Sequence, residues 1–463
     1  MSHSLGLYAD GRLAGRLHYE PAQDRWTLIY EPAWVAWPNA FPLSPALPFE
    51  SPSGYAPGAV KRFVENLLPE GRALDISATT YNLSKTNIFG LIHALGVETS
   101  GAFRFWPDDC PPPGSAALAP LREVSLTELN ERLAQRAQIP FVLWDGKPRM
   151  SVAGYQDKLL VYLDAPLGAA GGGMFLTEPP MASTHILKPQ PLDPSMPHLV
   201  VNEHYCMTLA FRMGLPVART SLLRAQCPVL VVSRFDRMKT LGPDGPGGPN
   251  GPDGFVSRPV IQRLHVIDAC QACDLPVSSK YERNIGNGEM VRHIRDGVSF
   301  ERLFSRVEQT MNKAAARLNM LRWALFQLLI GNSDAHGKNY SFFVQGAGLE
   351  PAPWYDLVSV VQYPNVNHEM AMAYGDVFVH EEVKSFALAD FAQRCGVDRA
   401  VLRREAARMA RLVQKHAMAL AQSDDYREDE RAFVQQISRF VVAQAIRLER
   451  EVGLAARIRD EFL

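Results

Sequence analysis

The stretch Leu328-Leu-Ile-Gly-Asn-Ser-Asp-Ala-His-Gly-Lys-Asn-Tyr340 decides the fold of this 463-residue chain. The apolar run before it, from Leu318 to Ile330, predicts a buried helix that ends at Gly331. The polar residues that follow, from Asp334 to Asn339, must lie in a loop, because so many polar groups cannot enter a core without partners. The sequence therefore predicts a polar loop at the end of a core helix, which is a candidate active site.

The acidic and amide residues of this loop have a spacing that suits phosphoryl transfer. Such chemistry needs a carboxylate that accepts the proton of the attacking hydroxyl, an amide oxygen for Mg²⁺, and a second carboxylate that bridges metal and phosphates. Asp334, Asn339 and Asp356 supply these groups, and the interval from Asp334 to Asn339 repeats that of the protein-kinase catalytic loop. A solvated polar turn is the alternative for this motif alone, so the upstream sequence must decide.

Length and composition indicate a soluble globular protein of about three domains. The net charge of −1 gives no global field for nucleic acid, so a DNA contact would need a local patch or a partner. The first residues lack a basic region followed by an apolar one, and no apolar run approaches the roughly 18 residues that span a bilayer. We therefore expect a cytoplasmic protein that does not contact membranes.

The six cysteines do not form a disulfide framework in a chain of this length. Cys270 and Cys273 make a C-x-x-C motif, but the second ligand pair of a structural zinc site is missing. Buried thiols are the expectation.

Residues 1–110 are predicted to form a small α+β accessory module. Alternating residues on both sides of Asp10-Gly11 predict a hairpin from Leu5 to Tyr19, and Trp26 to Tyr30 predicts a third strand. Two segments with helical spacing follow, Ala59–Leu68 and Asn82–Leu95. The proline-rich segment Cys110–Ser115 is the first boundary.

The segment that follows this boundary contains three features that together suggest a nucleotide site. Ser151–Lys158 is a turn of small residues before a buried strand, and such turns present backbone N–H groups to phosphates. Lys188 lies in a short strand, and Glu203 opens the next apolar-spaced run, which is the order of the kinase lysine and its helix glutamate. The strand Val229–Phe235 would reach the adenine. Taken singly, these features are also typical of a hairpin turn, an exposed lysine and a solvated glutamate.

The order of these features is that of a bilobal kinase, and the chain resembles the HipA family of serine/threonine kinase toxins. The resemblance covers nearly the whole chain. It rests on these motifs: Ser151-Val-Ala-Gly154, Lys188, Asn202-Glu203, Arg234-Phe-Asp-Arg237, Cys270-Gln271, Lys280-Tyr-Glu282, Asp334-x-His-x-Lys-Asn339 and Tyr355-Asp356.

The resemblance implies a role for each site residue. Asp334 would be the catalytic base, Asn339 and Asp356 would hold Mg²⁺, and Glu203 would pair with Lys188. The ATP site would consist of Lys188 together with Val152, Ala153, Gly154, Tyr155, Gln156, Asp157, Lys158, Ser233, Arg234, Phe235, His336 and Lys338. Ser151 matches the serine that these kinases autophosphorylate, which displaces the phosphate loop and switches the enzyme off.

This sequence departs from the family pattern at three positions. Ser233 stands where an acidic residue often precedes the Arg-Phe-Asp motif, Tyr155 replaces a small residue, and Asp157 replaces a glutamate. The catalytic set is retained.

The resemblance also implies partners. Family members pair with a small DNA-binding antitoxin, HipB, so DNA would be contacted mainly through that protein. Known protein substrates include aminoacyl-tRNA synthetases. Two alternatives stay open from the sequence: a lipid or small-molecule kinase, and a kinase-fold binding module that acts as a co-repressor with a DNA-binding antitoxin.

The predicted fold class is α+β, a bilobal protein-kinase-like fold with the accessory module and a mostly helical C-lobe. The predicted parts are the module at 1–110, the kinase N-lobe at 111–240, a flexible Gly/Pro insertion at 241–254 and the C-lobe at 255–463. Within the C-lobe, apolar spacing predicts helical segments at Phe386–Ser423 and Glu430–Glu461.

Overall fold

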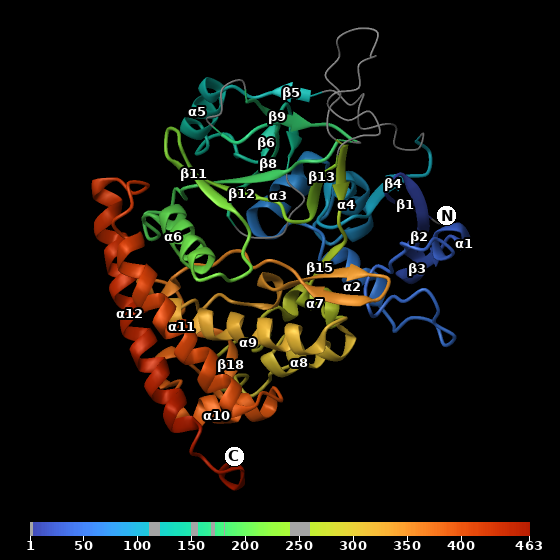
Figure 1. The fold of residues 1–463 in the computed structure, drawn as a ribbon. Helices are drawn as coiled ribbons and strands as arrows, with labels where there is room; N and C mark the ends of the chain where they lie inside the picture. The colour runs from blue at the N-terminus through green and yellow to red at the C-terminus, as the bar shows by residue number, and fades with distance from the viewer. Residues whose placement is uncertain (1–2, 111–120, 150–155, 168–171, 180, 241–259) are drawn as a thin grey trace, which may run out of the picture. The chain divides into compact units, whose positions relative to one another are not determined.

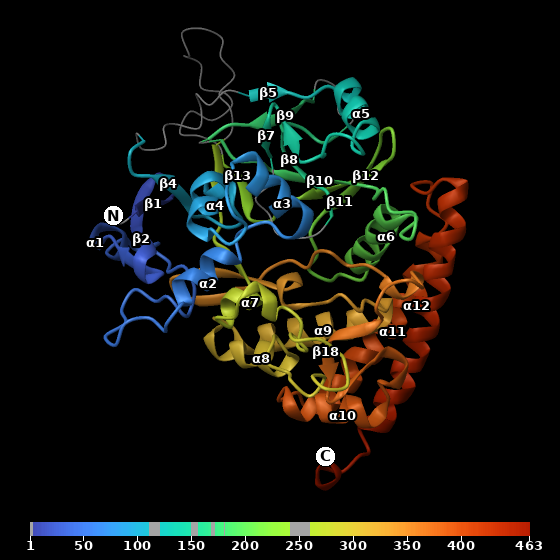
Figure 2. The same cartoon turned by 180° about the vertical axis from the view of Figure 1, so that it is seen from behind.

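The computed structural model describes residues 3–110, 121–149, 156–167, 172–179, 181–240 and 260–463 (Figures 1 and 2). These residues form two compact units. Unit 1 consists of Met1–Pro189, Leu223–Ile267 and Phe343–Gly346; unit 2 consists of Gln190–Leu222, Asp268–Phe342 and Ala347–Leu463. The predicted insertion at 241–254 lies outside the described residues. The predicted domain boundaries remain predictions.

Unit 1 begins with an antiparallel sheet of order β3-β2-β1-β4. Its strands are β1 (His3–Ala9), β2 (Arg12–Glu20), β3 (Arg25–Tyr30) and β4 (Arg104–Pro107). Asp10 and Gly11 join β1 to β2 with φ values of 48° and 74°, which the short turn requires and which these two residue types tolerate. The predicted hairpin and third strand are thus confirmed.

The helices of this module are shorter than the sequence predicted. They are α1 (Pro32–Val35), α2 (Ala59–Glu65), α3 (Gly71–Thr80) and α4 (Ile88–Leu95). The predicted start of the second helical segment at Asn82 is wrong, because the Asn87 side chain accepts a hydrogen bond from the Gly90 amide and caps α4 there.

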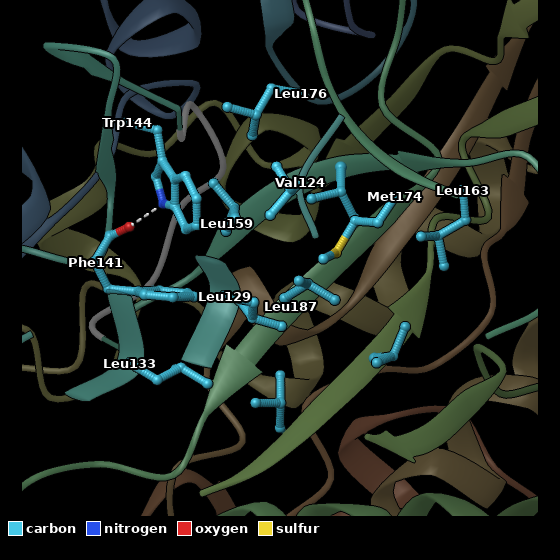
Figure 3. Close-up of a cluster of buried hydrophobic side chains, with 13 residues drawn as sticks. Val124, Leu129, Leu133, Phe141, Trp144, Leu159, Leu163, Met174, Leu176 and Leu187 are labelled. Atoms are coloured by element: carbon cyan, nitrogen blue, oxygen red, sulfur yellow. Dashed lines mark hydrogen bonds between the residues drawn. The ribbon is translucent and has the colours of Figure 1, made fainter. Parts of the chain in front are cut away.

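The second sheet has the strand order β11-β12-β10-β8-β9-β5. Its strands are β5 (Leu121–Glu123), β8 (Leu159–Leu163), β9 (Met174–Thr177), β10 (His185–Pro189), β12 (Pro228–Ser233) and, at the edge, β11 (Thr220–Arg224). Figure 3 shows the hydrophobic cluster on one face of this sheet, where the Trp144 indole donates to the Phe141 carbonyl at 2.7 Å. Leu159, Val161 and Leu163 belong to that cluster, so alternate residues of β8 face it.

The remaining elements of unit 1 surround this sheet. They are α5 (Leu126–Ala134), β6 (Leu143–Trp144), β7 (Lys147–Pro148), β13 (Arg237–Thr240) and β14 (Val260–Arg263). Two strands, β11 (Thr220–Arg224) and β15 (Val266–Asp268), lie where the chain passes from one unit to the other. The Ser125 hydroxyl accepts from the Glu128 amide and caps the start of α5.

Unit 2 is mostly helical. Its helices are α6 (Leu199–Arg212), α7 (Ala269–Ala272), α8 (Phe300–Ser305), α9 (Lys313–Ile330), α10 (Ser385–Arg394), α11 (Arg399–Leu420) and α12 (Glu428–Ala455). Its other strands are β17 (Gly348–Pro351), β18 (Glu369–Tyr374) and β19 (Val377–Val379), while β16 (Ser341–Gln345) begins in unit 2 and continues into unit 1. The long helices α11 and α12 lie side by side in both views (Figures 1 and 2).

Helix α9 ends where the sequence predicted, and the segment Phe386–Ser423 does not stay continuous. Gly331 takes a left-handed φ of 65° and caps α9. Gly396, with φ of 61°, follows α10, and the Asp398 carboxylate accepts from two amides at the start of α11. A single predicted segment is therefore two helices. Among the described residues, none of the helices is long and apolar enough to cross a membrane.

Candidate active site

Asp334 is an exposed residue within a buried loop. Its neighbours Ser333 and Ala335 are buried, as are the other residues from Leu328 to Tyr340. The Asn332 side chain donates to Gln327 at 2.9 Å and accepts from the Asp334 amide at 3.1 Å, so the end of α9 fixes the backbone of the loop. The sequence prediction of a polar loop was right, and the buried polar groups are accommodated because they bond to one another.

The predicted metal ligand Asn339 is bonded to the backbone of Asp334. Its side-chain Nδ2 donates to the Asp334 carbonyl at 2.9 Å, and the His336 amide donates to the same carbonyl at 2.9 Å. The Asn339 amide is oriented by this bond, because its oxygen must lie on the side away from the nitrogen. The structure thus brings the predicted base and the predicted amide ligand together.

Lys338 is held by a buried ion pair. Its ammonium donates to Asp268 Oδ2 at 2.6 Å, and the two side chains are 4% and 12% exposed. The other oxygen of Asp268 accepts from the Gln271 amide in the capping box of α7. The Lys338 carbonyl accepts from the Tyr355 hydroxyl at 2.6 Å. These bonds fix the second half of the loop.

His336 is a neutral residue of this loop. Burial and the nearby positive charges of Lys280 and Lys338 lower the pKa of its imidazole to about 3, against the opposing effect of Asp356. Its ring meets the Tyr281 ring edge to face, with centroids 5.1 Å apart. His336 is therefore uncharged near neutral pH.

Asp356 lies between two anchored residues of unit 2. On one side, the Trp354 amide donates to the Pro216 carbonyl and the Trp354 carbonyl accepts from the Ala218 amide. On the other side, Asn202 of α6 bonds to both the amide and the carbonyl of Ser359, at 2.8 and 3.1 Å. Asp356 itself has a φ of 58°, and a non-glycine residue in this region is typical of constrained functional segments.

Two lysines of the predicted phosphate site lie on neighbouring strands of unit 1. Strands β8 and β10 are antiparallel, with Leu159 opposite Leu187, so the next pair in this register is Lys158 and Lys188. Both side chains are buried, and both follow or precede a leucine of the hydrophobic cluster, so they face the opposite side of the sheet. Two lysines that face the same side of a sheet from neighbouring positions can contact the same anion.

The other predicted ATP-site residues have varied environments. The Gln156 side chain donates to the Pro189 carbonyl at 3.3 Å, and Ser233 pairs with His185 across strands β12 and β10. The Phe235 ring meets Phe343 edge to face at 5.9 Å. The Arg234 guanidinium is buried and donates to Asp236 at 2.8 and 3.0 Å.

Some predicted site residues cannot be compared with the structure. Ser151, Val152, Ala153, Gly154 and Tyr155 lie outside the described residues. Glu203 is buried in α6 of unit 2, whereas Lys188 belongs to unit 1, and their pairing stays a prediction. Asp157 is partly buried and lies two residues before β8 begins at Leu159.

Within the described ranges, no group of three or more His, Cys, Asp or Glu side chains is arranged to hold a metal ion. The six cysteines are free; Cys206, Cys270 and Cys395 are buried, as expected of buried thiols, while Cys110 is exposed.

Sequence reasoning assigned no role to two residues that contact the loop. Tyr281 donates its hydroxyl to Asp334 Oδ1 at 2.6 Å, and Asp268 pairs with Lys338. Tyr281 belongs to the Lys280-Tyr-Glu282 motif, which carried the resemblance without a stated role. Asp268 was not singled out, and its three-residue spacing to Gln271, a capping-box pattern, is the signal that could have found it.

Comparison with known proteins places the chain in a family. The HipA N-terminal domain matches residues 5–106, and the HipA-like C-terminal domain matches residues 150–421. The serine/threonine-protein kinase toxin HipA of Shewanella oneidensis is 36% identical over 462 residues, which cover 99% of this chain and 98% of that protein. The putative kinase Y4mE of Sinorhizobium fredii is 32% identical over 90% of this chain and 91% of its own length.

A solved structure of a relative also matches nearly the whole chain. The Shewanella oneidensis HipA in complex with HipB and operator DNA has a TM-score of 0.83 at 36% identity, over 98% of this chain and 100% of that chain. The fold class predicted from the sequence, a bilobal kinase-like fold with an N-terminal accessory domain, is therefore confirmed, and the chain is a serine/threonine-protein kinase. It belongs to the HipA family of kinase toxins.

Proposed function

We propose that this kinase transfers the γ-phosphoryl group of ATP to a serine or threonine of a protein, with Asp334 as the base. The observation that carries the proposal is the contrast between the exposed Asp334 side chain and the buried, hydrogen-bonded loop that holds it. A base must reach the substrate hydroxyl and keep its orientation, and this arrangement provides both.

Asn339 and Asp356 would hold Mg²⁺ in this scheme. The donor set fits, because Mg²⁺ takes carboxylate and other oxygen ligands, and the Asn339 amide is oriented by its bond to Asp334. Bound Mg²⁺ supplies compensation for the charge of the transferring phosphoryl group. Lys158 and Lys188 would bind the phosphates, because the register of β8 and β10 sets the two lysines side by side on the same face of the sheet.

Ser151 would be the site of autophosphorylation. A phosphoserine adds nearly two negative charges at neutral pH. At the start of the phosphate loop, these charges would repel the phosphates of ATP and switch the kinase off.

The partners of the chain would be those of a type II toxin-antitoxin system. The Shewanella oneidensis relative is solved with HipB and operator DNA, which supports a HipB-like antitoxin and DNA contact through it. The substrate would be a translation protein such as an aminoacyl-tRNA synthetase, whose phosphorylation would stop tRNA charging in the cytoplasm and arrest growth.

The test is mass spectrometry of the dephosphorylated chain after incubation with ATP and Mg²⁺. We expect one phosphate on Ser151 in the native sequence and none in Asp334→Asn. A lysate treated with the active chain should gain phosphate on a limited set of proteins. Folded protein that transfers phosphate to no protein would contradict the proposal.

The co-repressor alternative is favoured by one observation, the presence of operator DNA in the complex of the relative. The two functions are separable. If Asp334→Asn retains DNA-dependent binding of the antitoxin while it loses transfer, the chain performs both; a native chain with DNA binding and no transfer would leave only the co-repressor role.

A further inference from the structure

We infer that Tyr281 is a positioning residue for the catalytic base, an inference that rests on the proposed role of Asp334. The Tyr281 hydroxyl donates to Asp334 Oδ1 at 2.6 Å, and the two residues are 53 positions apart in the chain. The Tyr281 side chain is exposed, at 37%, so the hydroxyl lies at the same surface as the carboxylate.

The backbone places these two side chains together through one residue of β18. The Ala371 amide donates to the Ser333 carbonyl at 2.9 Å, and the Ala371 carbonyl accepts from the Glu282 amide at 3.0 Å. Ser333 and Glu282 are the immediate neighbours of Asp334 and Tyr281. The spacing between the base and the tyrosine is therefore set by main-chain bonds rather than by a chance surface contact.

A further main-chain bond joins the same two segments. The Gly337 amide donates to the Lys280 carbonyl at 2.8 Å. Residues 280–282 are thus bonded to the catalytic loop after Asp334 and, through β18, before it. The Tyr281 ring is also held by its edge-to-face contact with His336.

The residue after Tyr281 is a buried anchor. Glu282 is 1% exposed, and its carboxylate accepts from Arg295 Nε at 2.5 Å and from the Ala373 amide at 2.7 Å. These bonds fix the backbone next to Tyr281, so the phenol can move away only by rotation about its own side-chain bonds, which would break its ring contact with His336.

The chemical consequence follows from the two oxygens of a carboxylate. A short hydrogen bond to Oδ1 holds Asp334 in one rotamer, which defines where the carboxylate meets the substrate hydroxyl. Loss of that donor removes one restraint on the Asp334 rotamer, and a misplacement of about 1 Å costs roughly a hundredfold in rate. Tyr281 would therefore act on kcat through Asp334.

The test is Tyr281→Phe, which removes the hydroxyl and keeps the ring against His336. We expect kcat to fall about tenfold to a hundredfold, with the KM for ATP and the melting temperature unchanged. The control is Tyr55→Phe in unit 1, which removes a hydroxyl that donates to the Pro48 carbonyl, and should leave kcat as it is.

A double-mutant cycle separates positioning from fold. If Tyr281 acts through the base, Tyr281→Phe adds no further loss to the residual rate of Asp334→Asn. Equal additional losses in both backgrounds, an unchanged kcat, or a raised kcat would each overturn the inference. Full activity of Asp334→Asn would instead remove the base assignment itself, so the two failures are distinguishable.

Discussion

The arginine cluster of unit 1 and the catalytic loop of unit 2 place their charged groups differently. In unit 1, the cluster consists of four buried residues, Arg234, Asp236, Arg237 and Arg263, together with the partly buried Glu98. In unit 2, the catalytic loop buries most of its polar groups and leaves the Asp334 side chain exposed. Only the second arrangement exposes a charge to a substrate.

The charged groups of the arginine cluster bond to one another and to nearby carbonyls, although the buried Arg237 Nε has no hydrogen-bond partner among the described residues. Asp236 accepts from Arg234, from Arg237 and from the Gly101 amide. Burial alone would raise the pKa of Asp236, but the two arginines hold it well below its usual value. The Thr99 carbonyl accepts from Arg237 and Arg263. Such a cluster ties the segment after α4 to strands β13 and β14, and it does not present a group for catalysis.

The difference shows that a charged motif can stabilise the fold as well as form a site. Arg234 is a predicted ATP residue because it belongs to Arg234-Phe-Asp-Arg237; its guanidinium lies within the buried cluster, and its contact with ATP stays a prediction. Asp334 was predicted from the same kind of pattern and is exposed. Exposure of the charge, together with a fixed backbone, separates the two.

The largest effect that the comparison predicts is on catalysis. Asp334→Asn should lower kcat by roughly 10² to 10⁴, because the amide cannot accept the substrate proton. The melting temperature should not change, since the side chain is exposed. Steady-state kinetics and a thermal melt measure both, with the exposed Asp424→Asn as the matched control. A variant with native kcat would remove Asp334 from the mechanism.

Breaking the arginine cluster should act on stability instead. Asp236→Asn leaves buried guanidinium groups of Arg234 and Arg237 without their carboxylate, a change that costs about 3 to 5 kcal/mol. Chemical denaturation should show this loss of unfolding free energy. An unchanged denaturation midpoint would show that the arginine cluster does not contribute to the stability of the fold.

A smaller effect is expected where unit 2 uses a buried amide to support the site. Asn202→Leu leaves the amide and carbonyl of Ser359 without their side-chain partner, at a cost of about 1 to 3 kcal/mol. Because Ser359 follows Asp356 closely, we also expect a higher KM for ATP with Mg²⁺. Stability and KM should change together; a change in stability with native KM would limit Asn202 to the fold.

The smallest effect concerns pH. Burial, with the positive charge of Arg263, lowers the pKa of His265 to about 4, although its bond to the Leu43 carbonyl acts in the other direction. The unfolded chain takes up this proton below pH 6.5, and the folded chain does not until about 4. Acid therefore favours unfolding, and His265 should account for about 2 kcal/mol of lost stability at pH 5.

The matched variant is His265→Gln, whose amide can still donate to the Leu43 carbonyl. Denaturation at several pH values should show a shallower loss of stability between pH 7 and 5 than in the native chain. The readout is this slope, since the variant also loses ring contacts with Phe41 and Phe103 and starts less stable. An identical slope would exclude His265 as a source of acid sensitivity.

The local features were determined by the sequence itself. The hairpin at Asp10-Gly11, the end of α9 at Gly331 and the cap at Ser125 depend on a few adjacent residues whose backbone preferences are strong. The order of the kinase motifs was likewise readable, and it led to the family. Gly396 and Asp398 carried the same kind of signal for a break between α10 and α11.

Only the tertiary structure decided what distant residues do to one another. The register of β8 and β10 sets Lys158 beside Lys188, and β18 brings Tyr281 to Asp334 across 53 positions. Local backbone preferences do not determine these pairings, because the pairings depend on strand register and on main-chain bonds between segments far apart in the chain. For the same reason, the sequence could name Arg234 and Asp334 as charged motif residues, while the fold buried one and exposed the other.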